Sequence, residues 1–490
     1  MLKTTDEQAA AADAFNQGDH LVLQAGAGTG KTTTLALLAT GTRRRGRYLA
    51  FNKAIAQEAT RRFPRTVICK TPHALAFAAL GHRYAARLNG PRRPAWRSGQ
   101  DLGISKPVRI GDRDVTPLVL SHTTLRTVTR YCHTAEPALT RHHLPHLRGL
   151  EAPELHTQLA QAVLPFASKA WTDLQHPENG VVRFDHDHYL KMWALTEPRI
   201  DADFLLLDEA QDTNPVLEQV FNNQRDHAQL VMVGDSAQAI YGWRGAKDVM
   251  TGFKGTALTL SKSFRFGPDL AAEANRWLAI ADAPIRLNGT DTIPTELTTV
   301  DHPDAVLCRS NVGAIAEVIR LLEANQQVAL VGGGESLRAL ALAARDLKEG
   351  RRTSHPELVL FRTWSELQDY AEHDPAGGDL QPLVDLIDHH GPDAIPAAVD
   401  QLSQEHDADV MVSTAHKAKG REWSAVRIGD DFLPPKDSDQ LDETGQPVPG
   451  PIDDAEARLA YVAVTRARHR LDLGGLSWIH DHPNATPLSR

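Results

Sequence analysis

The stretch Ala25-Gly26-Ala27-Gly28-Thr29-Gly30-Lys31-Thr32 decides the fold of this chain. It follows the apolar run HLVLQ and precedes a segment of helical character. Its glycines let the backbone curl so that several N–H groups point at phosphate oxygens. Lys31 would supply a charge for the β- and γ-phosphates, and Thr32 a hydroxyl for Mg²⁺. The stretch therefore predicts a nucleotide-binding P-loop. A strict P-loop pattern has glycine at position 25, so a simple glycine-rich turn is the alternative interpretation.

A second segment supplies the acid that a nucleotide site needs. The apolar run FLLLD ends at Asp208, and Glu209 follows it directly. Asp208 would hold Mg²⁺, and Glu209 would orient or deprotonate an attacking water molecule. An Asp-Glu pair after a strand is often only a solvated turn, but its pairing with the glycine loop favours catalysis. These two segments are compatible with kinases, transporter ATPases and GTPases as well as with other P-loop ATPases.

Short apolar runs alternate with helical patterns along the chain, which is typical of parallel sheets covered on both faces. The runs that we interpret as strands are residues 20–24, 47–51, 66–69, 204–208 and 230–234 in a first group, and 305–308, 328–331, 410–414, 426–429 and 471–473 in a second. Mainly helical stretches interrupt both groups, and the Pro- and Gly-rich residues 432–454 are expected to form a surface loop. The sequence therefore predicts an α/β fold with two domains, each carrying a helical insertion.

The charge of the chain is unevenly distributed. Its formal net charge is −9 over 490 residues, yet residues 41–113 hold seventeen Lys and Arg against three Asp and Glu. Such a basic region suits a phosphate backbone, and a solvated basic face explains it equally well. The segment Asp185-His186-Asp187-His188 could bind a metal, but a solvated polar loop is the favoured interpretation.

Several features argue against secretion or membrane insertion. The N-terminal residues lack the basic start and apolar core of a signal peptide, and no run of about 18 apolar residues occurs. The cysteines, Cys69, Cys132 and Cys308, are far apart and form no CxxC pair. We therefore expect no disulfide framework and no Cys-rich zinc or iron–sulfur site. The expected location is the cytoplasm.

Beyond the two nucleotide motifs, the chain resembles superfamily 1 helicases of the UvrD/Rep/PcrA type, and most of all their compact, F-box-helicase-like branch. In that family alanine is common at the first P-loop position, as at Ala25. The resembling segments follow in the family's order: TDEQ at 5–8, LAFNKAIA at 49–56, KTPHALA at 70–76, DEAQD at 208–212, VGDSAQAIYGWRGA at 233–246, SFR at 263–265, VSTAHKAKGREW at 412–423 and EARLAYVAVTRARHR at 456–470.

The resemblance implies two RecA-like P-loop domains with parallel sheets, each with a mainly helical insertion. The implied boundaries are 1–73 with 201–256 for domain 1A, 74–200 for insertion 1B, 257–334 with 407–490 for domain 2A, and 335–406 for a reduced insertion 2B.

The resemblance also implies ATP and Mg²⁺ as cofactors. Gln8 would read the adenine edge, Phe264 would stack on adenine where the family usually has Tyr, and Glu422 would bind the ribose. Gln238 would contact the γ-phosphate, and Arg265 and Arg466 would act as arginine fingers. The implied catalytic residues are Lys31, Asp208, Glu209, Gln238, Arg265 and Arg466. The implied phosphate-binding residues are Ala25, Gly26, Ala27, Gly28, Thr29, Gly30, Lys31, Thr32 and Thr33, and the implied metal ligands are Thr32 and Asp208.

The implied partner is single-stranded DNA, or DNA with a single-stranded tail. Tyr241 and Trp243 offer flat faces on which bases could stack, worth about 1–3 kcal/mol per base, although Trp243 taken alone reads as a core aromatic. Tyr461 would support the nucleotide site or the DNA groove. The implied DNA-contacting residues are Phe51, Asn52, Thr71, His73, Tyr241, Trp243, Arg244, Thr414 and His416.

The predicted function is that of an ATP-dependent single-stranded DNA translocase or helicase in DNA repair, recombination or replication, and the resemblance favours 3′-to-5′ movement. The stretch 335–406 is much shorter than the corresponding subdomain of UvrD or Rep. A DNA-regulated ATPase subunit of a defence or repair complex, with a protein partner and without strong unwinding, is therefore the alternative. A helicase–nuclease fusion is not expected, because about twenty residues after Arg470 are too few for a nuclease domain.

Overall fold

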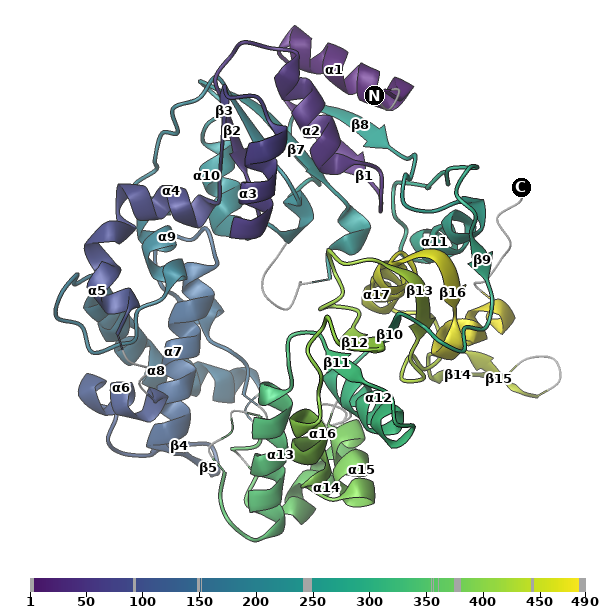
Figure 1. The fold of residues 1–490 in the computed structure, drawn as a ribbon. Coiled ribbons are helices and arrows are strands. Elements are labelled where there is room, and N and C mark those ends of the chain that lie inside the picture. Colours follow the sequence, from purple (N-terminus) through teal and green to yellow (C-terminus); the bar gives the residue numbers. More distant parts are fainter. Residues whose placement is uncertain are drawn as a thin grey trace. The chain divides into compact units, whose positions relative to one another are not determined.

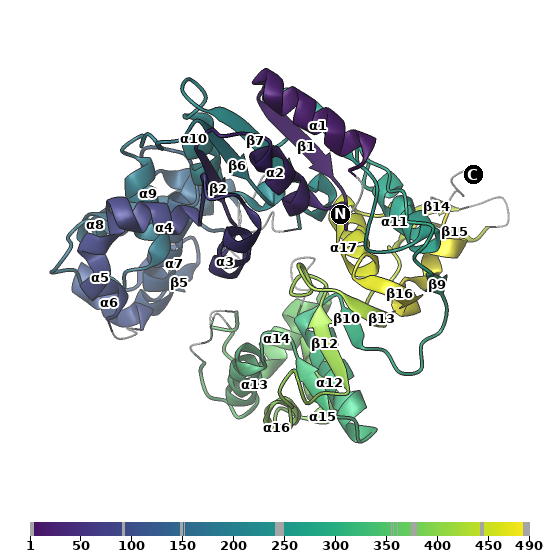
Figure 2. The same cartoon turned by 45° about the horizontal axis from the view of Figure 1, so that its top comes forward.

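The chain divides into two compact units (Figure 1, Figure 2). The structure is a computed structural model that describes residues 4–90, 94–147, 150, 152–240, 249–353, 355, 357–359, 361–373, 380–441 and 445–483. Unit 1 comprises residues 1–25 and 31–260, and unit 2 comprises residues 26–30 and 261–490. Each unit contains one six-stranded sheet.

The sheet of unit 1 has the strand order β3-β2-β6-β7-β1-β8, and its pairings are parallel. Its strands are β1 (Leu21–Ala25), β2 (Gly46–Leu49), β3 (Val67–Lys70), β6 (Phe204–Leu207), β7 (Gln229–Gly234) and β8 (Thr256–Leu260). Because side chains alternate along a strand, Phe204 and Leu206 share a core with Phe15, whereas Leu205 and Leu207 share a core with the helical insertion. Helices therefore cover both faces, and β6 is buried throughout.

Helices of two kinds surround this sheet. On the face of Phe204 lie α1 (Asp6–Gln17), α2 (Lys31–Thr40) and α3 (Lys53–Arg62). The chain between β3 and β6 forms α4 (Pro72–Ala79), α5 (Ala85–Leu88), α6 (Ala95–Leu102), α7 (Pro117–Cys132), α8 (Pro153–Leu174) and α9 (His186–Ala194), with the short hairpin β4 (Val108–Ile110) and β5 (Arg113–Val115). α10 (Pro215–Asn222) lies between β6 and β7 in the chain. The predicted helical insertion of the first domain is thus confirmed.

The sheet of unit 2 has the strand order β11-β12-β10-β13-β16-β9 and is also parallel. Its strands are β9 (Glu296–Leu297), β10 (Ala305–Cys308), β11 (Val328–Leu330), β12 (Val410–Thr414), β13 (Trp423–Ile428) and β16 (Ala467–Asp472). The helices are α11 (Pro268–Ile280), α12 (Asn311–Glu323), α13 (Glu335–Lys348), α14 (Trp364–His373), α15 (Gln381–His390), α16 (Ala394–Asp400) and α17 (Asp454–Val464). Helices α13 to α16 lie between β11 and β12 and share one core with those strands and α12.

The predicted fold class is confirmed, since two parallel sheets with helices are what two RecA-like α/β domains require. The ten expected strands all occur, with their ends moved by a few residues. The edge strands β8 and β9 were not predicted, because β8 alternates in exposure and β9 is exposed. The expected loop at 432–454 was wrong in part, since β14 (Asp437–Leu441) pairs with β15 (Pro447–Pro449). Its prolines obscured this exposed two-stranded sheet.

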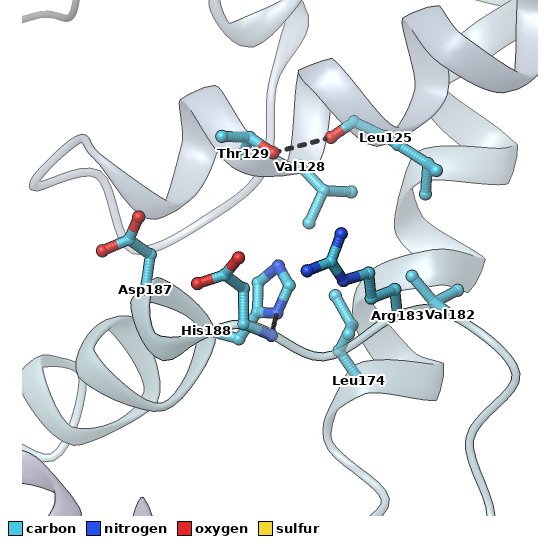
Figure 3. Close-up of a pocket in the computed structure, with 9 residues that line it drawn as sticks. Leu125, Val128, Thr129, Leu174, Val182, Arg183, Asp187 and His188 are labelled. Carbon is cyan, nitrogen blue, oxygen red and sulfur yellow. Dashed lines mark hydrogen bonds between the residues drawn. The ribbon is translucent and has the colours of Figure 1, made fainter. Parts of the chain in front are cut away.

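The segment from Asp185 to His188 is a helix start and not the expected polar loop. Asp185 is the N-cap of α9, and its backbone N–H donates to Nδ1 of His188 at 2.8 Å. Asp187 accepts from His73 and His133, each at 2.9 Å. His188 and Asp187 line a pocket together with Arg183 (Figure 3). Within the described ranges, no group of three or more His, Cys, Asp or Glu side chains is arranged to hold a metal.

Burial of His188 makes the stability of the fold dependent on pH. Burial lowers the pKa of His188 to about 4, whereas an unfolded histidine titrates near 6.5. Above pH 6.5 the side chain is neutral in both states, and between 6.5 and 4 the unfolded chain binds the additional proton. The unfolding free energy should therefore fall by up to about 1.4 kcal/mol per pH unit across that window.

The variant His188→Gln isolates this contribution. Glutamine preserves the capping-box acceptor for the N–H of Asp185 and does not titrate. Urea unfolding measured from pH 7 to pH 4 should show a smaller loss of stability in the variant than in the wild type. Equal slopes in the two proteins would contradict the role of His188.

Candidate nucleotide-binding and DNA-contacting site

The P-loop joins the end of β1 to the start of α2. Gly28 and Gly30 have φ of 75° and 78°, values that L-residues rarely adopt. A Cβ atom on Gly28 would lie 2.6 Å from both Ser263 Oγ and Arg265 Cβ. Thr29 closes the turn by donating its hydroxyl to the Gly26 carbonyl at 2.9 Å. Glycine at position 28 is thus required both by the backbone angle and by the close approach of Ser263–Arg265, which belong to unit 2 together with residues 26–30.

Asp208 lies at the carboxyl end of β6 and is 3 % exposed. Its Oδ2 accepts from the hydroxyls of Thr32 and Tyr48, both at 2.6 Å, and its Oδ1 accepts from the Glu209 N–H at 2.9 Å. Burial and the Glu209 charge raise the pKa of Asp208, while the two hydroxyls and Lys31 oppose that rise. The structure thus brings together Lys31, Thr32 and Asp208. A hydroxyl beside a carboxylate is a set of hard oxygen donors that fits Mg²⁺.

Glu209 follows in a strained conformation, with φ of 51°. Its Oε2 accepts from Gln211 Nε2 at 2.6 Å. Gln211 is fully buried, and its Oε1 accepts from the backbone N–H of Asp235 at 3.0 Å. Asp235 Oδ2 accepts from Gln238 Nε2 at 2.7 Å. A chain of hydrogen bonds therefore connects Glu209, the predicted water-orienting carboxylate, with Gln238, the predicted γ-phosphate contact.

Gln8, the predicted adenine reader, is held at the start of α1. The capping box places its Oε1 within 3.2 Å of the Thr5 N–H, and its Nε2 donates to Thr34 Oγ1 at 3.1 Å. Thr34 belongs to α2, the helix that the P-loop leads into, whereas Thr33 of its first turn is exposed. Both ends of the amide are thus oriented by protein contacts beside the P-loop helix.

Three predicted nucleotide contacts of unit 2 gather around the loop Gly26–Gly30. The N–H of Phe264 donates to the Gly28 carbonyl at 2.8 Å, and the Phe264 side chain is 36 % exposed. Arg265 Nε donates to Glu422 Oε2 at 2.7 Å, and its Nη1 donates to the Thr465 carbonyl at 2.8 Å. An aromatic face, a guanidinium and a carboxylate thus lie near one another in this unit.

Arg466 and Tyr461 are more deeply buried. Arg466 is 2 % exposed; its Nε donates to the Val462 carbonyl at 2.9 Å and its Nη1 to the Arg421 carbonyl at 3.3 Å. Its guanidinium therefore donates to two backbone carbonyls and, through Nη2, to the Thr465 hydroxyl at 3.0 Å. The hydroxyl of Tyr461 accepts from the Ala27 N–H at 3.0 Å. One backbone amide of the P-loop thus donates a hydrogen bond to Tyr461. The sequence had predicted for this tyrosine only a supporting role at the nucleotide site or the DNA groove.

The predicted DNA contacts of unit 1 lie after β2 and β3. Asn52 caps α3 by accepting from the Ile55 N–H at 2.9 Å, and Thr71 caps α4 by accepting from the Ala74 N–H at 3.1 Å. Phe51 is 54 % exposed directly before Asn52. Two helix N-termini and an exposed ring therefore lie at the carboxyl edge of the sheet. Helix N-termini favour phosphate, and a free ring face favours a base. His73 bonds instead to Asp187.

The remaining predicted DNA contacts are less open or lie outside the described part. Thr414 is 4 % exposed and accepts from the Lys417 N–H at 3.2 Å, so its hydroxyl holds the turn after β12. His416 beside it is partly exposed. Tyr241, Trp243 and Arg244 lie outside the described residues.

Tyr48 and Gln211 were not among the site residues predicted from the sequence. Tyr48 is a tyrosine inside the strand run RYLAF, and a buried tyrosine needs a partner for its hydroxyl. That requirement was a usable signal, but the partner Asp208 is 160 positions away in the chain. Gln211 lay within the DEAQD motif without an assigned role.

The chain is similar to known proteins over most of its length. Residues 8–244 match the family model of an AAA domain, and residues 359–476 match the UvrD-like helicase C-terminal domain. The F-box DNA helicase protein 1 of Schizosaccharomyces pombe is 30 % identical over 505 positions, covering 94 % of this chain and 56 % of that protein. The F-box DNA helicase 1 of Gallus gallus is 27 % identical over 495 positions, covering 93 % and 47 %. The chain thus spans about half the length of these relatives.

The parallel sheets, the P-loop and its acidic partner define a P-loop nucleoside triphosphatase with two RecA-like domains. The chain belongs to the UvrD-like superfamily 1 helicases, a family of ATP-hydrolysing enzymes.

The close packing of Gly234 against Gln211 predicts the effect of a single added methyl group. In Gly234→Ala the new Cβ would lie 2.4 Å from Gln211 Oε1 and 2.7 Å from Met250 Sδ. We expect the unfolding free energy to fall by about 1–3 kcal/mol, as overpacking usually costs. Urea denaturation measures it, with Gly41→Ala as the control, because a methyl there meets its nearest neighbour at 3.6 Å. Equal stability of both variants would contradict the contact.

Proposed function

We propose that the chain is an ATP-dependent translocase on single-stranded DNA, with helicase activity on DNA that carries a single-stranded tail. The observation that carries this proposal is the hydrogen bond of 2.6 Å that the hydroxyl of Thr32, shortly after the P-loop glycines in the chain, donates to Asp208 Oδ2. It supports a nucleotide site with a divalent cation, because a hydroxyl and a carboxylate there are the oxygen ligands that Mg²⁺ prefers.

In the proposed reaction, residues of unit 1 act on the phosphates. Lys31 neutralises charge on the β- and γ-phosphates, and Thr32 with Asp208 would hold Mg²⁺, which supplies charge stabilisation when bound. Glu209 orients the attacking water and accepts its proton. The hydrogen bonds through Gln211 and Asp235 supply a route by which Gln238 responds to the same event.

Further nucleotide contacts are proposed, from the family resemblance, for residues of unit 2. Phe264 stacks on the adenine and Glu422 binds the ribose. Arg265 and Arg466 stabilise the transferring phosphoryl group. For Arg466 this requires its guanidinium to leave the backbone carbonyls of Val462 and Arg421. A nucleotide-driven rearrangement around α17 is therefore part of the proposal.

DNA binding is proposed for the carboxyl edge of the unit 1 sheet, where Phe51, Asn52 and Thr71 lie. His73, Tyr241, Trp243, Arg244, Thr414 and His416 complete the proposed set. The two relatives are F-box DNA helicases, and this similarity supports DNA as the partner. Movement 3′-to-5′ and a role in repair, recombination or replication are proposed from the family resemblance, as are domain boundaries at 73/74, 200/201, 256/257, 334/335 and 406/407.

A cytoplasmic location is also proposed. In the described part of the chain, no helix combines the length and the apolar character needed to cross a membrane. The cysteines Cys69, Cys132 and Cys308 are buried as free thiols and form no disulfide, which suits a reducing compartment.

One observation favours the alternative of a DNA-regulated ATPase subunit. Helices α13 to α16 share a single core with the unit 2 sheet, with Leu337, Leu367 and Ile387 all buried in it. Because these helices are packed into the core of the sheet, they leave little separate surface that could bind a DNA duplex. Such a protein would hydrolyse ATP and bind a protein partner without separating strands.

The P-loop lysine tests the nucleotide assignment. Lys31→Ala should abolish ATP hydrolysis while leaving the fold intact, because Lys31 lies at the end of the loop where the triphosphate is expected. Phosphate release measures turnover, and Lys254→Ala, at an exposed position of the same unit, is the control. Turnover in Lys31→Ala equal to that of Lys254→Ala would show that the site lies elsewhere.

Displacement of streptavidin from biotinylated oligonucleotides separates translocation from the alternative. A 3′-to-5′ motor should free streptavidin from a 5′-biotin and leave a 3′-biotin occupied, in the presence of ATP. Displacement of streptavidin from the 3′-biotin alone would show movement in the 5′-to-3′ direction instead. If neither end is cleared while ATP hydrolysis proceeds, the ATPase-subunit alternative is correct.

A further inference from the structure

Tyr48 lies in β2, outside the residues to which nucleotide chemistry is assigned. Its side chain is fully buried, and its ring packs against Phe63 with the centroids 4.8 Å apart. Its hydroxyl donates to Asp208 Oδ2 at 2.6 Å. Strand β2 is the direct neighbour of β6 in the sheet, with Tyr48 paired to Leu206. The sheet register therefore places this hydroxyl at the carboxylate that ends β6.

The hydrogen bonds of Asp208 divide unequally between its two oxygens. Oδ2 accepts from two hydroxyls, those of Tyr48 and Thr32, and Oδ1 accepts from the Glu209 N–H. Hydroxyl-to-carboxylate bonds of this length are charge-assisted and strong. Together the three donors leave the buried carboxylate little freedom to rotate.

The two hydroxyls on Oδ2 are not equivalent. The Thr32 hydroxyl is carried by a partly exposed residue at the start of α2, and it is itself a candidate cation ligand. The Tyr48 hydroxyl sits on a rigid ring that Phe63 packs against inside the core. If Thr32 turns its oxygen toward a cation, Tyr48 still holds Asp208 in place.

The simpler explanation is that Tyr48 is a core residue whose hydroxyl needs any acceptor. Tyr131 of the same unit illustrates that case: it is 1 % exposed and donates to the Pro137 carbonyl at 2.9 Å. The two tyrosines differ in the group that accepts the hydrogen bond from the hydroxyl. A backbone carbonyl is already fixed by the chain, whereas a carboxylate can rotate unless donors hold it.

We propose that Tyr48 is a positioning residue that fixes the Asp208 carboxylate for a divalent cation bound with the nucleotide. This inference rests on the cation site at Thr32 and Asp208 under the proposed function. It assigns to β2 a part in the ATPase site in addition to the part of β1 and β6.

Tyr48→Phe tests the proposal by removing the hydroxyl and preserving the ring contact with Phe63. Binding of Mn²⁺ in the presence of ADP is followed by electron paramagnetic resonance. Loss of a group that holds a metal ligand typically weakens metal affinity about 10–100-fold, and we expect about tenfold here. The Mg²⁺ concentration for half-maximal ATP turnover should rise by a similar factor, while turnover at saturating Mg²⁺ stays near the wild-type value.

Tyr131→Phe is the matched control, since it also removes one hydroxyl from a buried tyrosine, and its Mn²⁺ affinity should equal that of the wild type. Equal affinity in Tyr48→Phe would overturn the role of Tyr48. A Tyr48→Phe chain that lost its fold, seen by circular dichroism, would also overturn it, because the hydroxyl would then serve the core. Absence of Mn²⁺ binding by the wild type would instead refute the cation site itself.

Discussion

The candidate nucleotide site of this chain is built around one buried carboxylate. Strand β6 is covered on both faces, so the side chain that ends it, Asp208, is also removed from water. A carboxylate in such a place is costly unless donors surround it. Thr32 from α2, Tyr48 from β2 and the following N–H supply those donors. The same bonds connect the P-loop helix with β2 and with the end of β6.

This constraint extends to the surrounding loops. The turn after Asp208 places Glu209 in the left-handed region, from which it accepts a hydrogen bond from Gln211. Gln211 also holds the backbone of Asp235, and Gly234 is needed to make room for it. The buried Gln211 side chain therefore joins the segments that follow β6 and β7. Strain of this kind persists only where the surroundings enforce it, and it is common at catalytic sites.

Much of the fold and part of the site were predictable from the sequence. The P-loop glycines and the Asp208-Glu209 pair were predictable because phosphate and metal chemistry demand those residue types after an apolar strand. Strands buried on both faces appeared as apolar runs. The edge strands β8 and β9 did not, since exposure there removes the hydrophobic signal.

Other features required the sheet order. Tyr48 meets Asp208 only because β2 and β6 are neighbours in the sheet. The direction of the Arg466 guanidinium depends on which carbonyls the end of α17 and the turn at Arg421 present to it. Neither the order of the motifs nor the residue types predict such contacts. The sequence likewise gives no sign that His73, a predicted DNA contact, forms a hydrogen bond with Asp187, which lies 114 positions away in the chain.

We propose that ATP hydrolysis at this nucleotide site is coupled to the binding of single-stranded DNA. The most direct measurement is the rate of ATP hydrolysis by the whole chain with and without single-stranded DNA, at saturating ATP and Mg²⁺. We expect a many-fold increase in this rate when the DNA is added. A rate unchanged by single-stranded DNA would contradict the coupling of hydrolysis to DNA.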